Sequence, residues 1–157
     1  MSFSVIVLVW GAILFVLTNS YIICFGTPFP SFGSVEHNAY FKFPSSAHNI
    51  EYDANGVNRK AGCTIWVKFE MDSAEFNTFV QTTAIHDLSA SASLTNDAFS
   101  YISTPKGWNQ PTGALAGRAQ PQRNADDIWV SADQWIVVDV AHPNHYIVYL
   151  IVNQEWL

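Results

Sequence analysis

The sequence predicts an α+β protein, with an N-terminal transmembrane helix followed by a small domain in which one main helix packs on an antiparallel sheet. Residues 5–25 are almost wholly apolar and contain no charged side chain. Several later stretches alternate apolar and polar residues, which is the pattern of half-buried strands. Residues 72–80 have the apolar spacing of a helix, and strands that flank a helix and a long loop are typical of an α+β domain.

The apolar segment is long enough to cross a membrane. A helix of about 20 residues spans a bilayer core of about 30 Å. The interruptions of the segment, such as Gly11 and Asn19, are uncharged, so its insertion remains favourable. We therefore expect a retained anchor.

A cleaved signal peptide is the alternative interpretation. Residues 5–17 resemble a short apolar core, and residues 18–20 (Thr-Asn-Ser) resemble a cleavage site. However, the first four residues lack basic side chains, and the apolar run resumes at residues 21–25. Both features favour an anchor.

We divide the chain into an anchor or uncleaved signal (1–25), a linker (26–38) and an α+β globular domain (39–157). Pro28 and Pro30 prevent helix continuation into the linker, and its glycines and serines predict a loosely extended chain. Phe29 and Phe32 are unusual in a free tether. We expect them on the membrane surface, on the domain or against a partner.

Charge and cysteine content limit the partners and the location of the domain. The formal net charge of −6 lies entirely beyond the anchor, so the domain lacks the basic surface that nucleic acid requires. No Lys or Arg precedes Lys42, and only the terminal amino group and the short N-terminal flank favour a domain outside the cytoplasm. Cys24 and Cys63 do not form a disulfide framework, and we expect Cys63 to be a small buried side chain.

The first half of the domain contains the clearest strand pattern, at residues 63–71. Shorter strands are predicted at 39–43 and 49–53, with a hairpin tip at 54–62 that contains Asn55-Gly56. Trp66 interrupts the polar side of the 63–71 strand. It predicts either cross-strand packing or an interface that stacks on a ligand or partner.

A helix is predicted after this strand. Asp72 stands at the N-cap and Glu75 three residues later, an acidic form of the capping box. Phe76, Phe79 and Val80 then lie on one apolar face that covers the sheet.

The second half of the domain is predicted as a loop at 83–95, a short helix at 96–102 and a long loop at 103–124. Strands are predicted at 127–131, 134–140 and 146–153, with a tight turn at 142–145 joining the last two. A long irregular loop is usually functional or mobile. Trp108 in this loop is therefore the first place to look for a ligand.

The residues that carry chemistry are few. His142, His145 and Asp139 are close in sequence, but a zinc site needs three or four converging ligands. His86-Asp87 with a loop serine, and carboxylate pairs such as Asp126-Asp127, are patterns that many chains contain. We therefore expect no enzyme activity, no catalytic residue, no metal and no cofactor.

The chain resembles a loosely defined group of small membrane-anchored or exported bacterial proteins of no assigned activity. The resemblance lies in FKFPSSAHNI (41–50), TIWVKFEM (64–71) with the following helix, and YIVYLIV (146–152). It implies the α+β fold and a bacterial envelope setting. It transfers no catalytic residue.

The sequence thus predicts a single-pass accessory or structural subunit of a larger membrane-associated assembly, which acts through protein–protein contacts. Its partners are membrane lipid and proteins of that assembly, without nucleic acid, and its domain lies on the extracytoplasmic side. The alternative is an envelope binding module for a small molecule or glycan that uses the 103–124 loop. The interface candidates are small or aromatic residues that lack an evident core role: Trp10, Gly11, Phe29, Phe32, Trp66, Trp108 and Trp156.

Overall fold

The computed structural model describes residues 24–25, 30–58, 62–100, 105, 107–111, 114–122 and 129–156. The predicted transmembrane helix lies outside these residues except for its last two positions. None of the described helices is both long and apolar enough to cross a bilayer.

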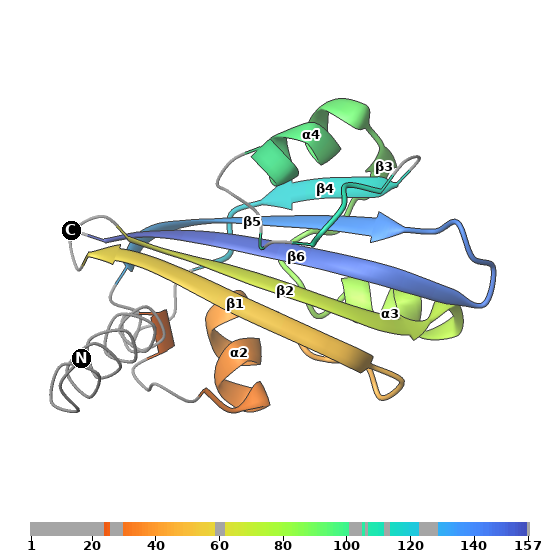
Figure 1. Ribbon diagram of the computed structural model, residues 1–157, viewed down its shortest axis with the longest axis horizontal. Coiled ribbons are helices and arrows are strands. Elements are labelled where there is room, and N and C mark those ends of the chain that lie inside the picture. Colours follow the sequence, from red (N-terminus) through yellow and green to blue (C-terminus); the bar gives the residue numbers. More distant parts are fainter. Residues whose placement is uncertain are drawn as a thin grey trace, which may run out of the picture.

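The domain is built on a six-stranded antiparallel sheet in the order β1-β2-β6-β5-β4-β3 (Figure 1). The predicted antiparallel sheet of an α+β domain is thereby confirmed, whereas several short helices take the place of the one main helix that was predicted. The strands are β1 (His48–Asn58), β2 (Gly62–Asp72), β3 (Ser89–Ala90), β4 (Leu115–Ala119), β5 (Trp129–Asp139) and β6 (His145–Trp156). The helices are α2 (Phe32–Ala39), the short 3-10 helix η1 (Ser73–Glu75), α3 (Phe76–Val80) and α4 (Ala92–Ser100).

The three long central strands β2, β6 and β5 follow from their alternating sequences. In β2, Ile65, Val67 and Phe69 point to one side of the sheet and are fully buried. Trp66, between them, is buried on the other side. Because both sides of these strands are covered, the sheet is the middle layer of the domain.

We name the two sides of the sheet after the helices that cover them. The α2 face is covered by α2 and α3, whose Val35, Ala39 and Phe79 belong to its apolar cluster. The α4 face is covered in part by α4, whose Ala98 packs with Trp135 and Tyr149. Figure 1 shows α2 and α3 on one side of the sheet and α4 on the other.

The strand predictions are confirmed for β2 and β6 and need correction elsewhere. Residues 39–43 form no strand, because Tyr40 ends α2 in the left-handed conformation (φ 57°). β1 extends to Asn58, well into the predicted hairpin tip. The two strands predicted at 127–131 and 134–140 are one strand, β5, with a register shift between Trp129 and Ser131.

The helix and loop predictions also change in detail. A helix, α2, occupies most of the stretch predicted to be a loosely extended linker, because Ser31 caps it after Pro30 (Ser31 Oγ accepts the Ser34 amide at 3.2 Å). α4 begins at Ala92, four residues earlier than predicted, and β4 lies within the predicted 103–124 loop. The predicted capping box does not form: Asp72 makes no side-chain cap, and the carboxylate of Glu75 accepts hydrogen bonds from Ser45 and Ser46 instead of from the N-cap amide.

Candidate functional site

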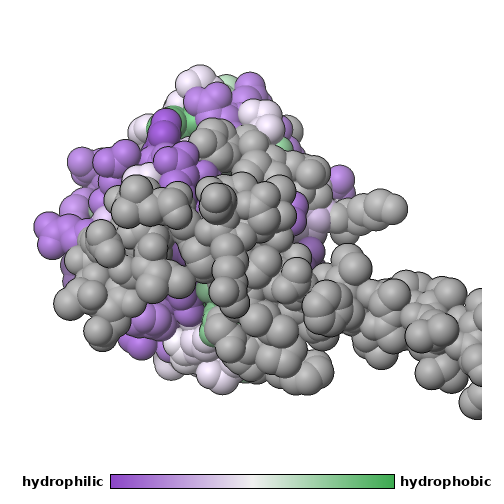
Figure 2. Space-filling model, turned by 90° about the vertical axis from the view of Figure 1, so that its left-hand side faces the viewer, coloured by the Kyte–Doolittle hydropathy of each residue, from purple (hydrophilic) through white to green (hydrophobic). Residues whose placement is uncertain are grey.

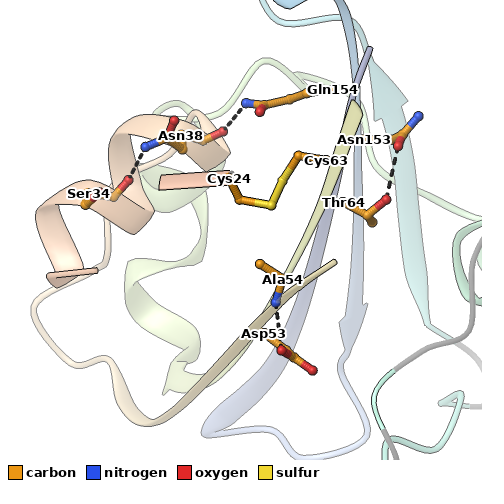
Figure 3. The surroundings of a disulfide bond; sticks show 9 residues. All are labelled: Cys24, Ser34, Asn38, Asp53, Ala54, Cys63, Thr64, Asn153 and Gln154. Carbon is orange, nitrogen blue, oxygen red and sulfur yellow. Dashed lines mark hydrogen bonds between the residues drawn. A yellow bond between two sulfur atoms is a disulfide. The ribbon is translucent and has the colours of Figure 1, made fainter. Parts of the chain in front are cut away.

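A disulfide bond joins the end of the apolar N-terminal segment directly to the sheet. Cys24 pairs with Cys63 at the start of β2, 39 positions later, and both cysteines are buried (Figure 3). The expectation of an unpaired, merely space-filling Cys63 is therefore wrong. Phe25 is buried as well, so Cys24 and Phe25 both pack in the core of the domain.

The backbone beside the disulfide leaves little room for change. Gly62 adopts a positive φ of 96°, which favours glycine. A Cβ atom at this position would collide with the carbonyl oxygen of Gln154 on β6. The backbone of β2 at Gly62 and Cys63 therefore lies tightly against Gln154 of β6.

Two buried glutamines fix the C-terminal end of α2 to the sheet beside the disulfide. Gln154 on β6 donates its side-chain amide to the carbonyl of Asn38 at 3.0 Å (Figure 3). Gln134 on β5 donates to the carbonyls of Ala39 and Tyr40 at 2.7 and 3.0 Å. Carbonyls at the end of a helix have no partner within the helix, so these bonds allow the helix end to be buried.

An aromatic patch is exposed at the opposite end of α2. Phe32 is 55% exposed, and among the described residues it is the one large hydrophobic side chain on the surface. Its ring meets Phe43 edge-on at 5.7 Å and Tyr52 of β1 at 6.4 Å between centroids. We call Phe32, Phe43 and Tyr52 the α2 patch.

The exposed surface of α2 is poor in charge although the protein is acidic. Glu36 of α2 is largely covered, and its carboxylate pairs with Lys42 at 3.3 Å and accepts the Phe43 amide at 2.8 Å. None of the exposed residues of the helix and its cap is Asp, Glu, Lys or Arg. These exposed residues are Ser31, Phe32, Gly33 and His37. Figure 2 shows one end of the molecule, where the described residues that are visible are mostly hydrophilic.

The α4 face holds two of the tryptophans that the sequence singled out in the domain, Trp66 and Trp108. Trp66 is 3% exposed, lies on β2 and has an indole N–H without a hydrogen-bond partner. Trp108 packs edge-on against Tyr149 at 5.8 Å and donates its indole N–H to Glu51 of β1 at 3.2 Å. Trp108 therefore lies on the sheet, across strands β6 and β1.

Electrostatic contacts surround this tryptophan pair. The hydrogen bond from Lys68, together with the bond from Trp108, holds the pKa of the Glu51 carboxyl below its usual value despite some opposing desolvation. Burial raises the pKa of the Tyr149 hydroxyl, and the negative charges of Asp139 and Glu51 add to this effect. The α4 face thus combines apolar packing with charged groups at its border.

Three surface hollows are present among the described residues. The first, of about 320 Å³, lies beside the α2 patch and is lined by Phe43, Phe79 and Glu75. The second, of about 340 Å³, lies between α4 and the long loop and is lined by Ala92, Gln110 and Ala114 among others. The third, of about 420 Å³, is an open polar hollow that includes His86.

Among the described residues considered for catalysis or metal binding, His86 lines one of these hollows, whereas Asp87, Asp139, His142 and His145 line none of them. The rings of His142 and His145 stack at 4.5 Å on an exposed turn, and Asp139 accepts the backbone amide of Ala141 at 2.9 Å. The described part of the chain contains no group of three or more His, Cys, Asp or Glu side chains placed to hold a metal ion. Asp126-Asp127 lie outside the described residues.

The remaining interface candidates are not described. Trp10, Gly11 and Phe29 lie outside the described residues, and so does the side chain of Trp156 at the end of β6. Their role in an interface stays a prediction. Two features could not be found by sequence reasoning as it was applied: the disulfide and helix α2. A signal for the helix was present, since Pro30-Ser31 is a helix start and the apolar residues Val35 and Ala39 are four positions apart.

Comparison with protein-family models, with curated proteins and with solved structures finds no match for this chain. Its function is therefore argued from its own geometry.

Proposed function

We propose that this chain is a membrane-anchored accessory subunit whose domain lies outside the cytoplasm and acts through protein–protein contacts. The observation that carries the proposal is the Cys24–Cys63 disulfide, which joins the end of the apolar segment 5–25 to strand β2. In this proposal the apolar segment is the single membrane span.

The disulfide supports the extracytoplasmic location. Structural disulfides persist in oxidising compartments and are rare in the cytosol, where thiols are kept reduced. Both sulfur atoms of this bond belong to buried side chains. The bond is thus part of the packed domain, as a structural disulfide is.

The short attachment supports a positioned subunit. A flexible linker would let the domain explore a wide volume around its anchor. Here the anchor ends at Cys24, which is bonded covalently to the sheet, and α2 is fixed nearby by Gln134 and Gln154. Such an attachment holds the domain at a defined place beside the membrane, which suits a component of a fixed assembly.

The test is extraction of the native membrane with a gentle detergent, followed by size analysis and mass spectrometry. We expect the chain to migrate within a stable, larger complex, with residues 1–23 retained. Migration as a single chain from which the first 20 residues have been removed would contradict the proposal.

A variant with both cysteines replaced (Cys24→Ser with Cys63→Ser) tests the role of the attachment. We expect this variant to remain in the membrane but to leave the complex more readily during extraction. An unchanged complex would show that the covalent attachment does not position the subunit.

A second candidate function is an envelope binding module, and the hollow between α4 and the long loop favours it. Its volume of about 340 Å³ lies at the lower end of the range for ligand pockets. Its lining combines small apolar residues such as Ala92 and Pro111 with the polar side chains of Ser91, Thr95 and Gln110, which suits a small ligand with both apolar and polar faces, such as a sugar.

A matched pair of variants tests this second candidate in a thermal-shift screen of glycans and small molecules. Ala92→Trp fills the hollow from its exposed border, and Ser93→Trp adds the same side chain at the next, exposed position, which does not line the hollow. A ligand whose stabilising shift is lost only in Ala92→Trp supports the binding module. Equal responses of both variants, or no shift with any compound, would argue against it.

A further inference from the structure

We propose that the α2 patch is the surface with which the domain rests on the lipid bilayer. This inference rests on the proposed function, because it requires the apolar segment to be inserted in the membrane. It assigns a binding partner, the interfacial layer of the bilayer, to Phe32, Phe43 and Tyr52.

The position of the anchor brings this surface near the membrane. Cys24 is bonded to Cys63 and Phe25 is buried in the domain, so no free linker separates the anchor from the domain. Phe32 follows Phe25 by seven positions, so the two Cα atoms lie within roughly 25 Å of each other. A membrane held at Cys24 is therefore within reach of α2.

The orientation of α2 agrees with this placement. The C-terminal end of α2, at Asn38, lies beside the disulfide (Figure 3). Phe32 begins the same helix at its other end. A bilayer surface that passes Cys24 and lies along α2 would meet Phe32.

The chemistry of the patch fits the interfacial layer of a bilayer. Aromatic rings are favoured where one side is apolar and the other is wet. Phe32 is supported from behind by Phe43 and Tyr52 and leaves more than half of its surface exposed. The Tyr52 hydroxyl donates to the Pro30 carbonyl at 3.1 Å, which fixes the chain just before the helix.

The charges near the patch predict insertion without attraction to anionic lipid. The exposed residues of α2 include no acidic side chain that anionic headgroups would repel. Lys42 is exposed but paired with Glu36, so the described residues offer no basic cluster beside the patch. Contact with neutral phosphatidylcholine should therefore be sufficient.

The test places a fluorescent probe on the full-length chain in phosphatidylcholine vesicles. The native cysteines are paired, so a single added cysteine, Phe32→Cys, can be labelled selectively with an environment-sensitive dye under oxidising conditions. Ser93→Cys on α4, exposed on the other face of the sheet, is the matched control. Flotation of the vesicles reports anchoring, and quenching by lipid-borne and aqueous quenchers reports the position of each dye.

We expect both variants to float with the vesicles. The dye at position 32 should show a blue-shifted emission, strong quenching from lipid and a depth of roughly 5–10 Å within the headgroup and acyl boundary. The dye at position 93 should respond to aqueous iodide alone. Neither result should change in about 0.5 M salt, because salt at this concentration screens surface charges and the proposed contact is apolar.

Three outcomes would overturn the inference. If the chain floats but iodide quenches both dyes equally, the patch faces water and the anchoring proposal survives. If the chain floats and the dye at position 32 is shielded from both quenchers, protein covers the patch, either a second copy or another subunit. If the chain does not float, the proposed anchor itself fails, and this inference fails with it.

Discussion

The two faces of the sheet are closed in different ways. The α2 face is covered by α2 and α3, and the disulfide to Cys24 and the glutamines Gln134 and Gln154 hold its cover in place. The α4 face is covered by α4 and Trp108 through non-covalent contacts alone among the described residues.

The α4 face also has ion pairs at its exposed border. On the α4 face, Arg118 lies 4.9 Å over the ring of Trp135 and pairs with Asp133 at 3.0 Å. Lys68 pairs with Glu51 at 3.1 Å nearby. Such half-exposed pairs contribute little to stability. The comparison teaches that a covalent bond and buried hydrogen bonds close the α2 face, whereas the α4 face depends on non-covalent packing and half-exposed charges.

The largest expected effect comes from breaking the covalent closure of the α2 face. In the double variant Cys24→Ser with Cys63→Ser, the unfolded chain regains the freedom of a loop of 39 positions. The chain-entropy model then gives a loss of about 4 kcal/mol in the free energy of unfolding. Urea denaturation measures this loss.

Hydrogen exchange of the same variant sharpens the comparison between the faces. Amide exchange should rise in α2 and change little in α4, because the disulfide supports only the α2 face. Equal acceleration in both helices would show that the two covers are not independent.

The next effect concerns the aromatic core of the α2 face. Phe79 is 1% exposed and packs edge-on against Phe69 at 5.4 Å and Phe41 at 6.3 Å. Phe79→Ala should therefore lower the free energy of unfolding by about 3–4 kcal/mol. Phe76→Ala, one turn away, is the control. Phe76 is half-buried and meets Tyr146 at 5.3 Å, so its loss should cost less than half as much.

A reversed order of these two variants, measured by urea denaturation, would contradict the packing of α3 described above.

The buried glutamine on β5 gives a smaller effect. Gln134→Leu keeps the size of the side chain but leaves the carbonyls of Ala39 and Tyr40, and the amide of Ala84, without their side-chain partner. We expect a loss of about 2 kcal/mol in the free energy of unfolding. Gln120→Leu, at an exposed position, serves as the control and should be almost neutral. Equal melting temperatures for both variants would mean that the end of α2 is not held by Gln134.

Much of the sheet could be predicted from the sequence, and the reason is local. β2 and β6 have alternating or continuous apolar runs, which specify a strand without reference to the rest of the chain. The helix at Phe76–Val80 follows from its spaced phenylalanines. These features depend on neighbours only a few residues apart.

The features that were missed depend on distant contacts. The Cys24–Cys63 pairing joins residues 39 positions apart, and no spacing rule predicts it from two cysteines. Helix α2 contains the weak helix formers Gly33, Ser34 and Asn38. Its stability comes from Val35 and Ala39 packing on the sheet and from the hydrogen bonds of Gln134 and Gln154. For the same reason, the exposed position of Phe32 could be expected only as one of three alternatives.

The smallest effect tests the charged border of the α4 face. Hydrogen bonds from Lys68 and Trp108 lower the pKa of Glu51 in the folded protein. Its contribution is therefore present above the ordinary pKa of 4.5 and is lost as the pH falls through the lowered folded value. Because Glu51 is largely exposed, Glu51→Gln should cost about 0.5 kcal/mol or less at neutral pH.

The measurement is urea denaturation of the Glu51→Gln variant and the unmodified chain between neutral and strongly acidic pH. The difference between the two chains should shrink towards acidic pH. A difference that stays constant over this range would mean that the Glu51 charge does not hold Trp108.

The most direct test of the central claim is the thiol state of the intact chain taken from its native membrane. The membrane fraction is treated with an alkylating reagent under denaturing, non-reducing conditions, and the intact mass is then measured. The account predicts a membrane-bound chain that retains residues 1–23 and carries no alkyl group, because Cys24 and Cys63 are bonded to each other. Two alkylated cysteines would place the domain in a reducing compartment and contradict the account.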